Sequence, residues 1–554
     1  MTQSSRREFL SYLTTVGAIV GVTPAVVTGF DAAISTARAQ TIAGGPVPPI
    51  RMWVPNWPDI MEIGRLITQS YAKLGITLDV QSGSMESGLG AIVGEHKVPH
   101  MVGMSWGGSP DRLDPDFWLS EFLHSRRAQK GGLNYGHYKN PAYDSVADAQ
   151  RAEMDVSKRV QLVREAQALS AKDNPSLVLL HRTTVQAYNK ARWEGPVAMV
   201  GSGIALPYVP WTYVGIKPKS NRKVIRVVAA YDMVTTNPFA TPEVFNVAML
   251  RLIYAPLVVR DKDAEVVPWA AEAVTVIDPT TVEVKIRAGL KFHDGRPVTA
   301  EDLKFTFDLI ADKKFPAMAR VWDSVVGVEV TGPSTGRIML KRPSASFIPT
   351  VLGYAFIVPK HIWSKLEGNL ADYANEKPVG YGPFKLREWR KGEYSMFDAN
   401  KEFFVPPHID ASIWMVVPNL ENQLAMMERG DADMIGSNLD AQQGNRLATS
   451  KDIEVVEVAN HGVHEIRLNL DLAPLDNPSM RLALQHATDR KQIIDVVFSG
   501  KATMATNGFI SPDLKQWGSR SFPNPTFDIE KGRAVLQEAG YTWDGNGKLL
   551  NPKS

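Results

Sequence analysis

Residues 50–80 contain the pattern that most limits the possible folds: a strand, a helix and a second strand in immediate succession. Ile50–Trp53 is typical of a strand, and Asp59–Leu74 has apolar residues near helical spacing before Gly75 ends the helix. Ile76–Val80 alternates apolar and polar residues, as a half-buried strand does. Two strands that a helix connects form a βαβ unit, so we expect an α/β fold. The apolar residues of the helix are Ile60, Ile63, Leu66 and Ile67.

The alternation of helices and strands continues along the chain. Pro175–His181 predicts a buried strand, and the strand at Val224–Ala229 follows a polar, basic stretch, residues 217–223, that is typical of a linker. Thr281–Ile286 and Leu290–Phe292 predict a pair of strands. Three helices are predicted: residues 155–172, with Val160, Leu162, Val163, Ala166 and Leu169 on one face; residues 299–311, with Thr299 as N-cap; and Ile529–Ala539, which Gly540 ends.

The size and charge of the chain limit its class. Its 554 residues are enough for about three domains or one large bilobal body. The 61 basic and 59 acidic residues nearly cancel, so the net charge of +2 gives no electrostatic footprint for nucleic acid or for an anionic membrane surface. We therefore expect no nucleic-acid partner.

The first 40 residues predict a targeting segment. Arg6 and Arg7 precede Phe9-Leu10 as in a twin-arginine signal, a mildly apolar run follows, and Ala37-Arg38-Ala39 is a small-x-small cleavage site. We expect cleavage near Ala39; the alternative is an uncleaved membrane anchor. The chain has no cysteine, so it has no disulfide to form and no cysteine for a lipid anchor. These features favour a free periplasmic protein over a lipoprotein.

Residues 281–307 (TVEVKIRAGLKFHDGRPVTAEDLKFTF) contain a long, specific motif: a strand, then R-x-G-x-K-F-H-D-G-x-P-x-T-A-E-D, then a helix. The motif resembles the signature of the dipeptide-, oligopeptide- and nickel-binding family of extracellular solute-binding proteins, family 5. The chain departs from the family's pattern at Tyr381, within the segment Pro378–Phe384, where the family usually has Thr. Other segments that resemble the family, in its order, are Leu250–Val258, Pro378–Phe384, Gly430–Asp433, Leu468-Asn469, Met480–Leu484, Asp489-Arg490 and 528–541.

The family's remaining segments resemble the front of this chain. Leu74–Ile76 resembles a strand entry of the family, Ser105–Trp118 its Trp-centred cleft loop, and Asn134–Asp144 its N-x-x-x-Y-x-N-P-x-x-D pattern. In relatives these segments come after the one that residues 528–541 resemble. We therefore expect a circularly permuted order, which costs little when the new break falls in an exposed loop.

The resemblance implies a type II, cluster C-like periplasmic binding protein with a cleft between two α/β lobes. With the permuted order, residues 50–190 and 465–554 are expected to form the second lobe of the family. Residues 191–216 and 224–464 are expected to form the first lobe, and 217–223 to join the family's usual C- and N-termini.

The best candidates for ligand contact lie in the loop at residues 104–118. Trp106 offers a flat apolar wall, although core packing is the alternative, and Gly107 and Gly108 let backbone amides approach a ligand. In peptide-binding relatives an Asp soon after this Trp pairs with the ligand's amino terminus; here Ser109 stands at that offset and Asp111 follows two places later. The remaining candidates, each weighed against a structural role, are Asn134, Tyr135, Asn237, Glu243, Phe245, Ser437 and Asn438.

No motif for catalysis or metal binding is found in the sequence. It has no G-x-S-x-G, H-E-x-x-H or P-loop pattern, and we interpret His293 as part of a structural turn. The resemblance implies a binding protein that delivers a solute to an ABC permease, and the absence of these motifs supports it. We therefore expect a monomeric, cofactor-free binder and not an enzyme. The alternatives are an exported α/β hydrolase and a periplasmic chemosensory binder. The ligand class stays open among peptide, opine, sugar and metal chelate.

Overall fold

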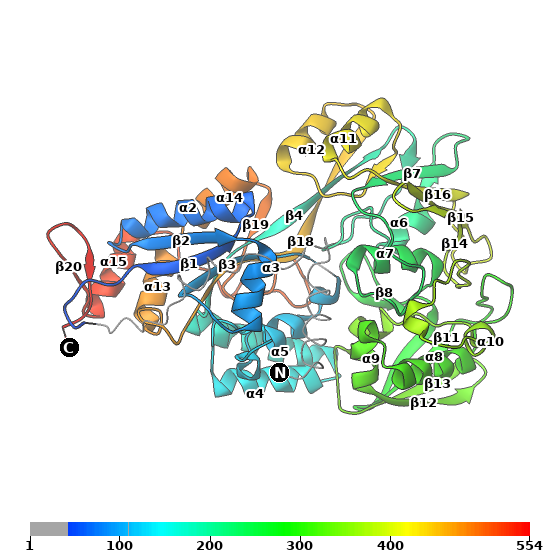
Figure 1. Cartoon of the computed structure of the whole chain (residues 1–554), viewed down its shortest axis with the longest axis horizontal. Helices are drawn as coiled ribbons and strands as arrows, with labels where there is room; N and C mark the ends of the chain where they lie inside the picture. Colours follow the sequence, from blue (N-terminus) through cyan, green and yellow to red (C-terminus); the bar gives the residue numbers. More distant parts are fainter. Residues whose placement is uncertain (1–41, 109, 554) are drawn as a thin grey trace.

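The computed structural model describes residues 42–108 and 110–553, which form two lobes side by side (Figure 1). Lobe A, on the left, consists of residues 42–182 and 463–553. Lobe B, on the right, consists of residues 183–459. Two long strands, β4 (Ser176–Asn189) and β18 (Ile453–Leu468), pass from one lobe to the other.

Lobe A contains the predicted βαβ unit, in which β1 and β2 pair in parallel. Its helices and strands are β1 (Ile50–Pro55), α2 (Pro58–Ala72), β2 (Leu78–Gly83), α3 (Met85–Leu89), β3 (Met101–Trp106), α4 (Pro141–Ala152), α5 (Val156–Asp173), α13 (Pro478–His486), α14 (Arg490–Phe498), β19 (Ala502–Met504), α15 (Ile529–Glu538), β20 (Thr542–Trp543) and β21 (Leu549–Leu550). Its short 3-10 and π segments are η1 (Gly90–Gly94), η2 (Pro110–Leu113), η3 (Phe117–Glu121) and η4 (Ser125–Arg127).

Lobe B combines part of the main sheet with a separate four-stranded antiparallel sheet, in the order β10-β11-β13-β12. Its helices and strands are β5 (Trp193–Glu194), α6 (Pro210–Gly215), β6 (Lys217–Pro218), β7 (Val224–Ala229), α7 (Val244–Ile253), β8 (Val258–Arg260), β9 (Val266–Pro268), β10 (Ala271–Asp278), β11 (Thr281–Ile286), α8 (Ala300–Lys313), α9 (Ala319–Ser324), β12 (Val325–Gly332), β13 (Thr335–Leu340), α10 (Lys360–Trp363), β14 (Phe384–Arg390), β15 (Tyr394–Ala399), β16 (Ala411–Val416), α11 (Leu420–Arg429), β17 (Met434–Ile435) and α12 (Ala441–Ala448). Its short 3-10 and π segments are η5 (Pro316–Met318), η6 (Ile348–Leu352) and η7 (Leu370–Asp372).

One sheet runs through both lobes, in the order β14-β15-β16-β7-β17-β4-β18-β3-β1-β2, with β19 added to β4. The antiparallel pair β4–β18 lies at its centre. From Ile453↔Asn189 to Ala459↔Thr183 the pair belongs to lobe B, and from Val463↔His181 onward it belongs to lobe A. Residues 460–462 form a bulge between the two registers. This bulge, which we call the hinge bulge, marks the junction of the lobes.

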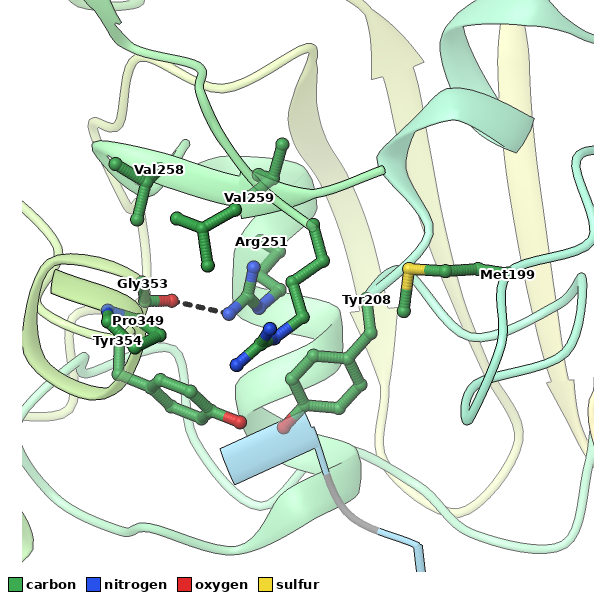
Figure 2. A pocket seen from close by; sticks show the side chains of 10 residues that line it. Met199, Tyr208, Arg251, Val258, Val259, Pro349, Gly353 and Tyr354 are labelled. Atoms are coloured by element: carbon green, nitrogen blue, oxygen red, sulfur yellow. Dashed lines mark hydrogen bonds between the residues drawn. The ribbon is translucent and has the colours of Figure 1, made fainter. Parts of the chain in front are cut away.

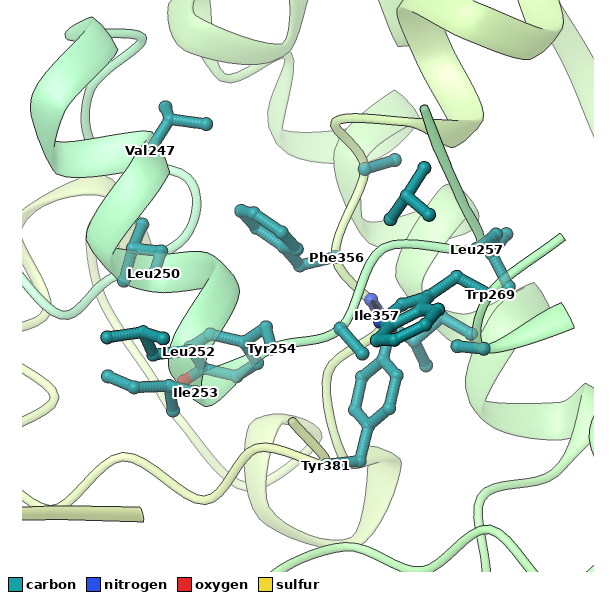
Figure 3. Packing of buried hydrophobic residues seen from close by; sticks show 14 of the residues in the cluster. Val247, Leu250, Leu252, Ile253, Tyr254, Leu257, Trp269, Phe356, Ile357 and Tyr381 are labelled. Atoms are coloured by element: carbon teal, nitrogen blue, oxygen red, sulfur yellow. Dashed lines mark hydrogen bonds between the residues drawn. The ribbon is translucent and has the colours of Figure 1, made fainter. Parts of the chain in front are cut away.

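Each lobe has its own apolar core. Helix α7 of lobe B is buried from Phe245 to Ile253, and its Leu250 and Ile253 pack in the same cluster as Trp269 and Tyr381 (Figure 3). The core of lobe A is made of two clusters, and both draw residues from the two ends of the described chain: Leu74 packs in one cluster with Leu536. Backbone hydrogen bonds also join the two ends of the described chain: Val47 N–H donates to Leu549 O at 2.9 Å.

Several local predictions are confirmed. β7 and β11 have the predicted bounds. Helix α8 begins after Thr299, whose backbone N–H and hydroxyl donate to the Asp302 carboxylate at 3.0 and 2.7 Å, so the N-cap prediction is confirmed. Helix α15 ends before Gly540, whose φ of +85° only glycine adopts readily.

Two local predictions are wrong in detail. Leu290–Phe292 is no strand: Lys291 forms one isolated bridge with Pro297, because a turn at Gly295 folds the segment back on itself, and β11 pairs with β10 and β13 instead. The buried face of α5 is also more polar than predicted, because Arg159 is ion-paired with Asp114 at 2.7 Å. The buried residues of α5 are Arg159, Val163, Ala166, Gln167 and Ser170, whereas Val160, Leu162 and Leu169 are partly exposed.

The predicted linker is largely exposed. Its first two residues form β6, which pairs with β5, and residues 219–223 are exposed to solvent. The predicted targeting segment lies outside the described residues. Within the part of the chain that the structure describes, no helix combines the length and apolarity needed to cross a bilayer.

Candidate functional site

The junction of the lobes is held by polar side chains on both connecting strands. In the hinge bulge, Asn460 Nδ2 donates to Thr184 Oγ1 at 2.9 Å, and Asn460 Oδ1 accepts from Gly462 N–H at 2.7 Å. Gln186 Oε1 accepts from the backbone N–H of Ile204 at 2.7 Å. The first two bonds order the bulge, and the third joins β4 to the segment of lobe B that contains Ile204.

A buried histidine faces the same bulge from β4. His181 is fully buried, and its Nδ1 lies 3.1 Å from the Gly462 carbonyl. Burial lowers the pKa of His181 to about 4, so the ring is neutral at neutral pH.

Trp106, Gly107 and Gly108 lead from the end of β3 to the hinge bulge. The Trp106 side chain is 3% exposed and meets Phe122 edge-on at 4.7 Å between ring centroids, within a core cluster of lobe A. A Cβ on Gly108 would lie 2.0 Å from Asn460 Oδ1, and one on Gly462 would lie 2.5 Å from Trp106 O. Glycine at these positions therefore allows the loop and the bulge to lie in direct contact.

The residues that follow this loop are only partly described. Ser109 lies outside the described residues, and Asp111 belongs to η2. Arg112 Nη1 donates to Gly107 O at 2.5 Å, and its guanidinium lies over the rings of Trp106 and Phe117 at 5.7 and 5.2 Å.

Asn134 and Tyr135 lie in the core of lobe A, and both side chains are fully buried. Asn134 Nδ2 donates to three backbone carbonyls, among them Tyr138 O at 2.8 Å. The Tyr135 hydroxyl donates to Glu465 at 3.3 Å, and Arg467 lies 5.0 Å from its ring centroid. Their polar groups are thus engaged within the lobe.

The candidates in lobe B occupy separate places. Asn237 is fully buried and donates to backbone carbonyls such as Leu370 O at 2.8 Å. Glu243 caps α7 by accepting from two backbone N–H groups, and Phe245 packs edge-on against Trp414. Asn438 is exposed and accepts from Val185 N–H on β4 at 2.7 Å, with half-buried Ser437 beside it. Within the described residues, Asn438 is the only one of these five whose side chain hydrogen-bonds to a connecting strand.

A small pocket of about 20 Å³ lies in lobe B around Arg251, and we call it the Arg251 pocket (Figure 2). The Arg251 guanidinium lies 4.8 Å from the ring centroid of Tyr208 and 5.2 Å from that of Tyr354, and its Nη2 donates to the Gly353 carbonyl. Burial lowers the pKa of Arg251, and the two tyrosines act in the opposite direction. The predicted site did not include Arg251, although one charged residue within the apolar run from Val247 to Val259 was a visible signal.

The Arg251 pocket lies beside contacts between the lobes. Met199 lines it, and the next residue, Val200, packs on a core cluster of lobe A. Ala264 of lobe B is buried in the same cluster, and Asp263 pairs with Lys515 of lobe A at 2.7 Å. On the other side of the junction, Ala345 N–H donates to Arg151 O at 2.8 Å. The two lobes therefore touch across their facing surfaces.

His293 lies in a strand-to-helix connection. Its Nε2 is 3.1 Å from Gly382 O, its N–H donates to Gly380 O, and burial lowers its pKa to about 4. Among the residues that the structure describes, no group of three or more His, Asp or Glu side chains could hold a metal ion.

Comparison with known proteins gives a family match. A model of bacterial extracellular solute-binding proteins, family 5 (middle part), matches residues 265–554, which is more than half of the chain. The glutathione-binding protein GsiB of Shigella flexneri is 28% identical over 332 residues, which are 58% of this chain and 62% of the relative. GsiB of Escherichia coli K12 is 28% identical over 330 residues, with the same shares. The chain thus spans about 62% of the length of these curated relatives.

A solved structure shows the same fold. HbpA2 from Haemophilus parasuis matches 57% of this chain and 67% of its own, with a TM-score of 0.50 and 24% sequence identity. The expectation of a two-lobed α/β binding-protein fold is confirmed by this likeness and by the family match.

Proposed function

The chain belongs to the bacterial extracellular solute-binding proteins of family 5, and from this we propose that it captures a peptide-like or other small polar solute between its lobes for an ABC importer in the cytoplasmic membrane. The family match favours binding over the hydrolase alternative. A relative is named for binding glutathione, which supports a peptide-like solute. In this proposal the protein works as a monomer and needs no cofactor.

The observation that carries this proposal is the junction itself. The chain passes between the lobes along β4 and β18, and the register of this pair shifts at the hinge bulge. A solute that contacts both lobes only when they are closed binds the closed state better, so it shifts the open–closed equilibrium. The permease would then recognise the closed surface.

We expect the purified protein to carry a small solute and to open when that solute is removed. Native mass spectrometry would reveal the solute as an added mass. Small-angle scattering should give a larger radius of gyration after release by unfolding and refolding, and the original value after the solute is added back. Absence of a bound solute, or scattering that does not change with it, would contradict the proposal.

The proposal includes export through the twin-arginine pathway, release near Ala39 and a free periplasmic protein. Replacing both Arg6 and Arg7 with Lys is expected to retain most of the protein in the cytoplasm, because the signal depends on the arginine pair. Cell fractionation and immunoblotting measure this. The matched control is the same double change at Arg126 and Arg127, which keeps their positive charge. Normal periplasmic levels of the first variant would overturn the twin-arginine assignment.

We also propose that the segments of this chain stand in a circularly permuted order relative to the family, with lobe A formed from both its front and its rear. Three contacts support this. Strand β18 lies between β3 and β4 in the sheet, Trp543 Nε1 donates to Leu74 O at 2.8 Å, and Tyr71 and Thr488 hydroxyls lie 3.1 Å apart. In this proposal residues 217–223 join the family's usual termini.

A further inference from the structure

One contact between the lobes lies away from the hinge bulge. Met154 stands in the turn between α4 and α5 of lobe A, and its side chain packs against the apolar core cluster of lobe B. Beside it, Ala345 N–H of lobe B donates to Arg151 O at 2.8 Å. Figure 1 shows α4 and α5 at the lower edge of lobe A, whereas β4 and β18 cross between the lobes above them. We call this contact, made by Arg151, Met154 and Ala345, the lobe latch.

Ion pairs hold the lobe A side of the latch in place. Arg151 Nε donates to both carboxylate oxygens of Asp116, at 3.0 and 3.2 Å. In the first turn of α5, the buried Arg159 pairs with Asp114 at 2.7 Å. The two helices that the turn joins are thus fastened to the same short segment of lobe A. Met154 is therefore presented to lobe B from a base that does not depend on lobe B.

The hydrogen bond of the latch joins a helix end in lobe A to a turn in lobe B. Arg151 O belongs to the last turn of α4, where carbonyls lack donors within the helix. The donor, Ala345, is the second residue of a turn that Phe347 N–H closes on Ser344 O at 3.0 Å. Water can satisfy both groups when the lobes separate, so this bond favours the closed form only modestly. Most of the preference must then come from the apolar contact of Met154.

The contact around Ala264 differs from the latch because it is tied to the hinge bulge. Val200 N–H donates to Lys262 O at 3.1 Å, and Gly201 N–H donates to Ala459 O of β18 at 2.8 Å. A contact beside a pivot moves little when two lobes rotate about it, whereas a contact away from the pivot has to separate. The latch is therefore the contact that opening breaks. A methionine suits such a contact, because its flexible side chain adapts to both states.

We propose that the lobe latch keeps a fraction of the solute-free protein closed, so that residues outside the solute site set part of its affinity. This inference rests on the proposed function and concerns the closing step, not the identity of the solute. The apparent dissociation constant equals the intrinsic constant divided by the fraction of molecules in the binding-competent state. A latch that raises the closed fraction therefore tightens binding without any contact to the solute.

The test measures the distance between the lobes in solute-free protein. The chain has no cysteine, so Ala142→Cys and Val326→Cys, at exposed positions of α4 and β12, place two spin labels for pulsed electron paramagnetic resonance. The short-distance fraction is expected to fall about five-fold in Met154→Ser, which loses apolar contact, and to persist in Met154→Leu. The matched control is Met61→Ser, which changes an exposed methionine of α2 and should leave the distances unchanged.

A second variant reaches the latch from lobe B. Ala345→Pro removes the N–H that donates to Arg151 O, and proline suits the second position of a turn, so the turn itself should persist. It should also lower the short-distance fraction, although less than Met154→Ser does. Urea unfolding should give midpoints close to that of the unchanged protein for both variants. A lowered midpoint with unchanged distances would assign Met154 a structural role only and overturn the latch.

Adding back the material that unfolding releases from the purified protein separates the latch from the proposed function. This material should shift the labels to the short distance, and Met154→Ser should need about five-fold more of it. A solute-free protein with the long distance only, or a Met154→Ser variant with the unchanged distribution, would overturn the latch and leave the proposed function standing. Distances that respond to Met154→Ser but not to the released material would support the latch and overturn the proposed function.

Discussion

Residues 42–216 are expected to remain unfolded when they are expressed without the rest of the chain. In the structure β3 and β4 lie on either side of β18, so this fragment lacks the strand at the centre of its sheet. Its core also lacks Ile466, Leu484 and the other members that the rear of the chain supplies. The expected loss is the whole cooperative transition, measured by urea unfolding with circular dichroism.

The matched control keeps every residue and changes only their order. Moving residues 42–216 behind Ser554 should give a chain that folds with nearly the same stability and binds the same solute. Gly44 N–H donates to Pro552 O at 3.0 Å, so the new junction lies where the backbone segments already meet. The remaining difference is loop closure, which depends only weakly on loop length. A cooperative transition in the isolated fragment would favour two consecutive domains and overturn the permuted order.

Replacing Arg467 with Met is expected to lower the free energy of unfolding by about 3–5 kcal/mol, because it leaves the buried Glu465 without its partner. Both side chains are fully buried, and two hydrogen bonds of 2.9 and 3.0 Å join them. Arg467 also donates to Phe122 O at 2.9 Å, so its loss leaves a second acceptor unpaired. Urea unfolding gives the change in free energy.

Two controls separate pairing from packing. The same change at Arg446, whose ion pair with Glu428 is exposed, should lower the free energy of unfolding far less than Arg467→Met does, because solvent screens an exposed pair. Adding Glu465→Gln to Arg467→Met should recover part of the loss, because the remaining group is then neutral. If Arg467→Met costs as little as Arg446→Met, the pair contributes little and this account of the lobe A core is wrong.

Local sequence patterns predicted the local elements well. The βαβ unit at residues 50–80, strands β7 and β11, and the N-cap of α8 depend on neighbours within a few residues, and their signals stand in the sequence. The prediction of a strand at Leu290–Phe292 was wrong. A turn at Gly295 folds the chain back there, so the segment forms only an isolated bridge between Lys291 and Pro297.

The candidate site was harder to predict. The residues at the end of β3 were identified from a motif, and the structure brings Gly108 against the hinge bulge. In sequence, Asn134 and Asn237 cannot be distinguished from amides that face a ligand. In the structure, the side-chain amides of both donate hydrogen bonds to backbone carbonyls of their own lobe. Polar side chains at loops satisfy either role, and only the neighbours decide which.

The sequence alone determined the class of the chain: an α/β binding fold, with its family signature at residues 281–307 and no cysteine to support the fold with disulfides. Those features depend on residue types and short spacings. Only the tertiary structure decided that β4 and β18 extend as 14- and 16-residue strands through both lobes, since their register joins residues as distant as Asn189 and Ile453. It also decided that Arg251 is buried with no carboxylate paired to it among the described residues, because the partners of a side chain are set by the elements packed around it and not by its neighbours in sequence.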